Sequence, residues 1–61
     1  MVKVGDIIRV YQMEQLAMVA KVWYDKSTAR TVIELNWGAY GDSKVYDHDE
    51  NKIWYKYSSS N

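Results

Sequence analysis

The clearest alternation of apolar and polar residues runs from Thr31 to Trp37. Ile33, Leu35 and Trp37 fall on one side of an extended backbone, and the residues between them fall on the other. This period of two is typical of a strand with one buried face. We therefore predict that residues 31–37 form the central strand of a small sheet, with these three side chains toward the core.

Two strands are predicted before this segment. Residues 7–11 place Ile8 and Val10 on one face. Residues 17–24 end in Val-Trp-Tyr, a combination that favours a strand. Strict alternation there predicts one face of Met18, Ala20, Val22 and Tyr24 and an opposite face of Val19, Lys21 and Trp23. Residues 13–16 are good helix formers, so one helical turn is the alternative for that stretch.

Two more strands are predicted after it, at residues 43–47 and 53–57. The last strand carries Ile53, Tyr55 and Tyr57 on one side and Trp54 and Lys56 on the other. A polar stretch at 12–15 follows the first strand, and turn-forming residues separate the later ones, at Asp25-Lys26-Ser27-Thr28, at Gly38-Ala39-Tyr40-Gly41-Asp42 and at the acidic stretch 47–52. Short strands with turn signals about every 8–12 residues predict an all-β domain, a five-stranded small barrel or a strongly bent antiparallel sheet.

Composition limits what such a domain can do. A chain of 61 residues forms one domain, predicted to span residues 1–57 with a flexible polar tail at 58–61. There is no cysteine, so neither disulfides nor thiolate metal sites stabilise the fold. Three tryptophans and six tyrosines supply the aromatic content without any phenylalanine. Tyr and Trp combine an apolar ring with a polar atom, which suits half-exposed positions and partner surfaces.

The charge pattern gives little attraction for nucleic acid or membrane surfaces. Eight basic and eight acidic side chains leave a formal net charge of zero. No apolar run approaches the roughly 20 residues of a membrane span, and no signal peptide is visible. We expect a soluble, intracellular protein in the cytoplasm, with no membrane partner.

Candidate chemistry is sparse. The single histidine, His48, has no nucleophile beside it, and the three glycines do not form a phosphate-binding run. Asp47, Asp49 and Asn51 begin like a calcium loop, but Lys52 stands where the turn glycine belongs and no glutamate closes the loop. We therefore interpret residues 47–52 as an acidic turn, and expect no metal, no cofactor and no enzymatic activity.

The order of these segments resembles the SH3-like small barrels, a superfamily that includes Tudor and chromo-barrel modules. The resemblance is carried by Val4-Gly5-Asp6-Ile7-Ile8, by the stretch from Val19 to Asp25 and by the stretch from Val32 to Gly38. It implies a five-stranded SH3-like β-barrel. Tudor modules that bind methylated lysine or arginine use an aromatic cage with a carboxylate, so the resemblance implies candidates for such a cage.

Three functional hypotheses follow. The first is a small non-enzymatic binding protein, a stand-alone bacterial or viral regulator that engages a protein or peptide partner through an aromatic-rich surface or a sheet edge, with self-association as a variant. The second is weak single-stranded nucleic-acid binding by a basic stripe of Arg9, Lys21, Lys26 and Arg30. The third is a Tudor-like methyl-lysine or methyl-arginine reader. The candidate binding residues are Trp23, Tyr24, Trp37, Tyr40, Asp42 and Tyr46, with Asp47 as a second carboxylate for the cage.

Overall fold

The computed structural model describes residues 1–60 and confirms the all-β prediction. The elements are β1 (Ile7–Val10), β2 (Ala17–Asp25), β3 (Arg30–Asn36), β4 (Asp42–Tyr46) and β5 (Trp54–Ser58), with two short 3-10 helices, η1 (Gly38–Tyr40) and η2 (Asp47–Asp49). No α-helix occurs within the described residues. Residues 13–16, where a helical turn was the alternative, form no helix, and a bend lies at Glu14 and Gln15.

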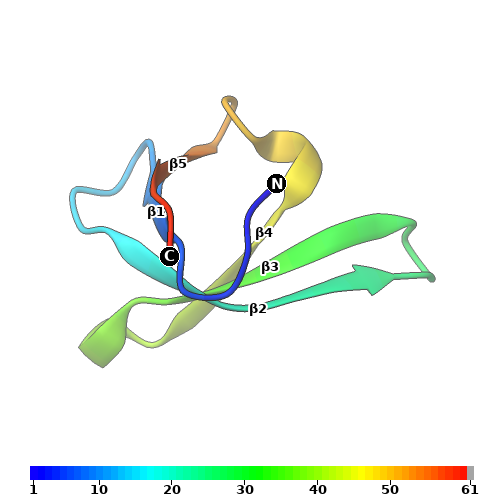
Figure 1. The fold of residues 1–61 in the computed structure, drawn as a ribbon, viewed down its shortest axis with the longest axis horizontal. Helices are drawn as coiled ribbons and strands as arrows, with labels where there is room; N and C mark the ends of the chain where they lie inside the picture. The colour runs from blue at the N-terminus through cyan, green and yellow to red at the C-terminus, as the bar shows by residue number, and fades with distance from the viewer. Residues whose placement is uncertain (61) are drawn as a thin grey trace.

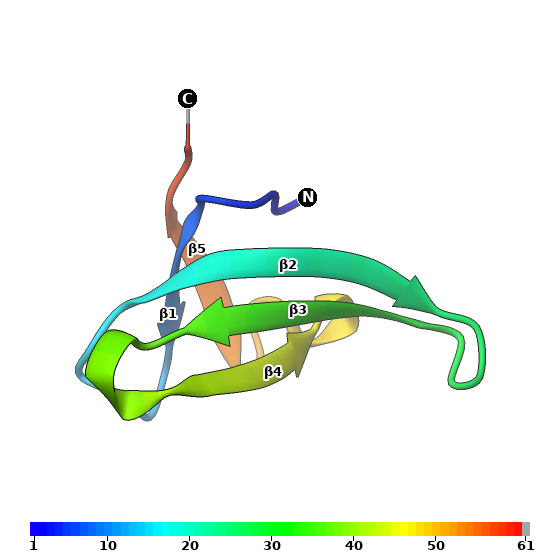
Figure 2. The same cartoon turned by 90° about the horizontal axis from the view of Figure 1, so that it is seen from below.

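All five strands belong to one antiparallel sheet with the order β4-β3-β2-β1-β5. The sheet bends strongly, so that β1 and β5 cross behind β2, β3 and β4 (Figure 2). The β2–β3 hairpin extends beyond the rest of the molecule (Figure 1). β4 and β5 are the two edges, and in the part of the chain that the structure describes no strand ladder joins them. The sheet is therefore bent but not closed.

The core lies in the concave space of this bent sheet. β3 supplies Ile33 and Leu35, which are fully buried, and Trp37 follows directly after the strand with 8% of its surface exposed. The predicted inward face of residues 31–37 is therefore confirmed. The rest of the core cluster consists of Val2, Ile8, Ala17, Val19 and Trp54.

A β-bulge at Ala20 corrects the predicted faces of β2. Val19 pairs with Leu35, but Lys21 pairs with Glu34, so one extra residue of β2 lies between the two pairs. A bulge residue shifts the alternation of every side chain that follows it. The prediction that Val22 lies opposite Val19 is therefore wrong, because Val22 pairs with Ile33 and packs against the core.

The C-terminal residues as far as Ser60 make specific backbone contacts. β5 includes Ser58, which pairs with Ile7. Ser60 donates a backbone hydrogen bond to Asp6. Within the predicted tail at 58–61, Ser58 and Ser60 therefore contact β1 and Asp6, and Asn61 lies outside the described residues.

Candidate functional site

The side of β2, β3 and β4 that points away from the core, called here the outer face, carries a group of aromatic and cationic side chains in mutual contact. Figure 2 looks onto it. The strand register defines its rows. Trp23, Val32 and Tyr46 lie side by side in one row, because Val32 pairs with both aromatic residues. Lys21, Glu34 and Lys44 form the neighbouring row.

Val32 shows that the aromatic row is packed. Its side chain alternates with those of the core residues in β3, and it is not part of the core cluster. It is nevertheless only 4% exposed. Directly opposed residues on one sheet face have Cβ atoms about 5 Å apart, so Trp23 and Tyr46 cover Val32 from either side. The outer face therefore has an apolar centre of its own.

Cations surround these two rings. The Nζ atoms of Lys21 and Lys44 lie 5.7 Å and 5.6 Å from the ring centroid of Trp23. The guanidinium carbon of Arg30 lies 5.0 Å from the centroid of Tyr46. These distances are within the range of cation–π attraction. The ring of His48 also stacks on Tyr46, with centroids 5.7 Å apart and an interplanar angle of 12°.

Two carboxylates share the outer face with the three cations. Glu34 lies between Lys21 and Lys44, yet neither lysine forms an ion pair with it among residues 1–60. Asp25 pairs with Arg30 across the hairpin. The Asp25 carboxylate instead accepts hydrogen bonds from the hydroxyl and N–H of Ser27, at 2.7 Å and 2.9 Å, and these lower the pKa of Asp25. The three cations therefore lie against aromatic rings rather than in ion pairs with the carboxylates of the outer face.

A second candidate region lies around η1, at the far end of β3 and β4. A surface hollow of about 400 Å³ is lined by Met13, Gln15, Trp37, Tyr40, Asp42 and Ser43. Among these residues, Trp37 donates its indole N–H to the hydroxyl of Ser43 at 2.6 Å. Gly41 adopts a φ of +89°, which favours glycine, and its N–H bonds to the carbonyl of Gly38 at 3.1 Å.

The predicted site residues fall into three separate places. Trp23 and Tyr46 lie on the outer face, whereas Trp37, Tyr40 and Asp42 meet at the η1 hollow. Tyr24 follows the bulge and alternates with Trp23, so it lies on the opposite side of the projecting hairpin and is 59% exposed. The six residues therefore do not converge on one aromatic cage. Asp47 lies in η2.

Sequence reasoning identified part of the outer face and missed the rest. Lys21 and Arg30 were predicted in a basic stripe, but Arg9 lies on β1 and Lys26 in the hairpin turn. Val32 and Lys44 were not predicted. The signal that could have found Lys44 is its alternation with Val45, which packs on the core and so directs its neighbours outward.

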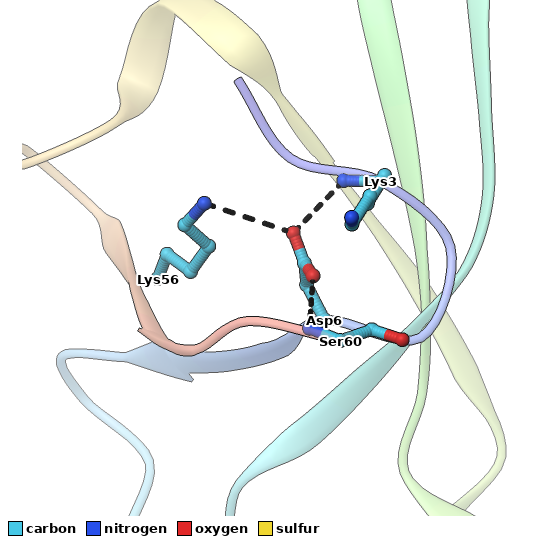
Figure 3. A network of polar contacts seen from close by, with 4 residues as sticks. All are labelled: Lys3, Asp6, Lys56 and Ser60. Atoms are coloured by element: carbon cyan, nitrogen blue, oxygen red, sulfur yellow. Dashed lines mark hydrogen bonds and ion pairs between the residues drawn. The ribbon is translucent and has the colours of Figure 1, made fainter.

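One buried carboxylate joins the two ends of the chain. Asp6 is fully buried, and its two oxygens accept hydrogen bonds from the N–H of Ser60 at 2.7 Å and the N–H of Lys3 at 2.9 Å (Figure 3). The ammonium of Lys56 lies 3.9 Å away. The N–H groups of Ser60 and Lys3, with help from Lys56, hold the pKa of Asp6 below its usual value. All these partners are internal, which makes Asp6 a structural residue.

Within residues 1–60 no group of three or more potential metal-ligating side chains comes together, and no helix there is long and apolar enough to cross a bilayer. Comparison of the chain with protein-family models, curated proteins and solved structures finds no match.

Proposed function

We propose that this chain is a non-enzymatic binding protein that engages a protein partner through the outer face of β2, β3 and β4. The observation that carries the proposal is the row of Trp23, Val32 and Tyr46, which forms a packed apolar centre outside the core. Aromatic residues and arginine are enriched at protein interfaces, and their binding energy concentrates in such central groups. We also propose an SH3-like barrel as the fold type, supported by the five short strands in one bent sheet.

The test is capture of a partner by the purified full chain from extracts of the source cells. Trp23→Ala removes the central ring of the outer face, and Tyr40→Ala removes a ring of the η1 hollow, 80% exposed and remote from it. We expect a stoichiometric protein with the unchanged chain and with Tyr40→Ala, and its loss with Trp23→Ala. Loss of the partner with Tyr40→Ala and its retention with Trp23→Ala would assign binding to the η1 hollow. A monomer in ultracentrifugation that captures nothing would contradict the proposal.

A second candidate function is weak single-stranded nucleic-acid binding by the same face. It is favoured by the two lysine ammonium groups near Trp23, since aromatic rings beside cations are typical of single-strand binding surfaces. Such affinity comes largely from counterion release and must fall steeply with salt. A titration with an oligothymidine strand at several salt concentrations separates the two functions. A binding constant that does not change with salt would exclude nucleic-acid binding.

A further inference from the structure

We propose that this chain forms a symmetric dimer through the outward side of β1 and β5, called here the β1–β5 face. The face consists of Ile7, Arg9, Tyr11, Ile53, Tyr55 and Tyr57. It is separate from the outer face of β2, β3 and β4. The inference therefore goes beyond the proposed function and does not depend on it.

The strand register directs these side chains away from the core. Arg9 pairs with Tyr55, and their neighbours along the two strands, Ile8 and Trp54, are fully buried. Because side chains alternate along a strand, Arg9 and Tyr55 point outward. The ring of Tyr11 lies beside that of Tyr55, with centroids 5.3 Å apart, so Tyr11 belongs to the same side.

Tyr57 extends the face toward the end of β5. It is the extra residue of the bulge in the β1–β5 ladder. The ammonium of Lys56, the residue before it, lies 3.9 Å from the buried carboxylate of Asp6, so Tyr57 projects to the opposite side. Tyr57 is also diagonal to Arg9, because Tyr55 pairs with Arg9 and comes two residues earlier. Diagonal neighbours on a sheet face are about 7–8 Å apart.

The β1–β5 face leaves a large apolar area exposed. Tyr11, Ile53 and Tyr57 are each 47–58% exposed, and Ile53 lies beside Tyr11, whose N–H its carbonyl accepts at 2.9 Å. Met18 of β2 pairs with Ile7 and is exposed to a similar degree. The four half-exposed side chains offer on the order of 500 Å² on each copy. Two copies would bury about 1,000 Å² in total, the lower limit of a specific interface.

The face also presents a cation and a ring that have no partner within the chain. Arg9 is its only charged side chain, and forms no ion pair within residues 1–60. Tyr11 and Tyr55 lie against each other, but no aromatic or cation–π pair of the described residues includes Tyr57. An arginine over a tyrosine ring forms a cation–π pair, and Arg30 forms one with a tyrosine on the outer face.

These two groups make the β1–β5 face complementary to itself. In a dimer with a two-fold axis, every contact occurs twice with the roles of the two copies exchanged. An axis midway between Arg9 and Tyr57 would place the guanidinium of each copy on the Tyr57 ring of the other. One cation and no carboxylate on the face give little attraction for nucleic acid or for a charged peptide. A second copy is therefore the occupant that the face fits best.

The small size of the chain gives a further reason for a second copy. Sixty-one residues supply a small core, and without cysteine no disulfide can reinforce it. Oligomerisation is another way in which small domains gain stability. Association through the β1–β5 face would bury apolar side chains that the monomer leaves in water. The thermal unfolding temperature should therefore rise with protein concentration.

Sedimentation equilibrium of the full chain tests the dimer. Because the buried area is small, we expect mostly monomer at about 1 μM and mostly dimer at about 1 mM. Two-dimensional NMR over the same range should show amide shifts in residues 7–11 and 53–57 and none in the hairpin turn at 26–29. A monomer at the higher concentration would overturn the proposal, as would a dimer whose shifts lie on the outer face.

Arg9→Gln tests the cation, and its effect is doubled because a symmetric dimer loses two contacts. The dissociation constant should rise about 5- to 30-fold, whereas Arg9→Lys, which keeps the charge, should stay within about threefold of the unchanged chain. Arg30→Gln is the matched control, since it makes the same charge change on the outer face and should have no effect. Equal dissociation constants for Arg9→Gln and Arg30→Gln would overturn the proposal.

Tyr57→Ser tests the ring that receives the cation. It should weaken the dimer at least about tenfold while the chain stays folded, because Tyr57 is exposed on an edge strand. Tyr24→Ser, an equally exposed tyrosine on the β2–β3 hairpin, should have no effect. A monomeric chain that captures another protein, and loses it with Tyr57→Ser but not with Trp23→Ala, would overturn the dimer and assign the β1–β5 face to a different protein.

Discussion

The carboxylate of Asp6 accepts a hydrogen bond from the backbone N–H of Ser60 at 2.7 Å, although the two residues are 54 positions apart. A second oxygen of the same carboxylate accepts the N–H of Lys3. Gly5 beside it has a φ of +95°, and a Cβ there would lie 2.7 Å from the Ser60 hydroxyl. One buried side chain thus holds the start and the end of the chain against β1 and β5.

We predict that Asp6→Asn destabilises the protein at neutral pH, because an amide oxygen is a weaker acceptor than a carboxylate and its NH₂ group has no acceptor in place. The pKa of Asp6 is lower in the folded chain than the usual 3.8. The contribution of the carboxylate to the free energy of unfolding is therefore complete above that value and is lost as the pH falls through the folded-state pKa.

Urea unfolding at pH 7 and at pH 3 measures this difference. The difference in the free energy of unfolding between wild type and Asp6→Asn should be largest at pH 7 and should shrink toward pH 3. Asp25→Asn is the comparison: the pKa of Asp25 is also lowered, but its partner Ser27 lies in the same exposed hairpin, so we expect a smaller loss of stability at pH 7 than with Asp6→Asn. A gap that is constant with pH would show that the charge of Asp6 is not what holds Ser60.

Trp37→Ala should lower the free energy of unfolding by about 3–5 kcal/mol, since it empties a buried aromatic site. It also removes the donor to Ser43. For a domain this small that loss is comparable to the whole stability. Chemical denaturation followed by circular dichroism checks it. A folded variant weakened by less than about 1 kcal/mol would contradict the position of Trp37 in the core.

Trp54→Phe tests a single hydrogen bond in the core. The indole N–H of Trp54 donates to the carbonyl of Tyr46 at 2.8 Å, linking β5 to the end of β4. Phenylalanine keeps most of the buried ring but leaves that carbonyl without its donor, at a cost of about 1–3 kcal/mol. Tyr55→Phe, on the neighbouring half-buried residue, should change stability by less than about 0.5 kcal/mol. Equal effects of the two variants would show that the bond contributes nothing.

Trp23→Ala should leave the protein folded, which makes it usable in the binding experiments. Trp23 is half-buried on the outer face, so we expect a loss of about 1–2 kcal/mol from the apolar area that it shares with Val32. Tyr40→Ala should be neutral within about 0.5 kcal/mol, because that side chain is mostly exposed. Thermal unfolding of both variants provides the check. A larger effect of Tyr40→Ala would contradict its exposed position.

The sequence predicted those features that depend on local alternation. The five strands, the inward face of Ile33 and Leu35 and the loop around Tyr40 all follow from neighbouring residues. Trp54 was harder to assign, because β5 carries aromatic rings on both sides and only the structure shows that Trp54 is the buried one.

The candidate site was less predictable for a physical reason. Asp6 appears in the sequence as a turn residue, and its burial depends on Ser60, far away in the chain. Trp23 and Tyr46 come together only through their common partner Val32, which requires the register of three strands. That register includes an extra residue in β2, which the pattern of polar and apolar residues does not indicate.

The extra residue, Ala20, divides β2 into two segments whose side chains alternate in opposite order along the sequence numbering. Before it, odd-numbered positions such as Val19 point inward, and after it even-numbered positions such as Val22 do so. Deleting Ala20 would restore one continuous alternation, in which Val19 and Val22 still point inward and Lys21 and Trp23 still point outward, because these residues pair with consecutive residues of β3. The outer face and the core of this strand thus exchange parity at one alanine, so the proposed binding surface depends on the bulge for the local bend and twist of β2 and not for the direction of any charged or aromatic side chain.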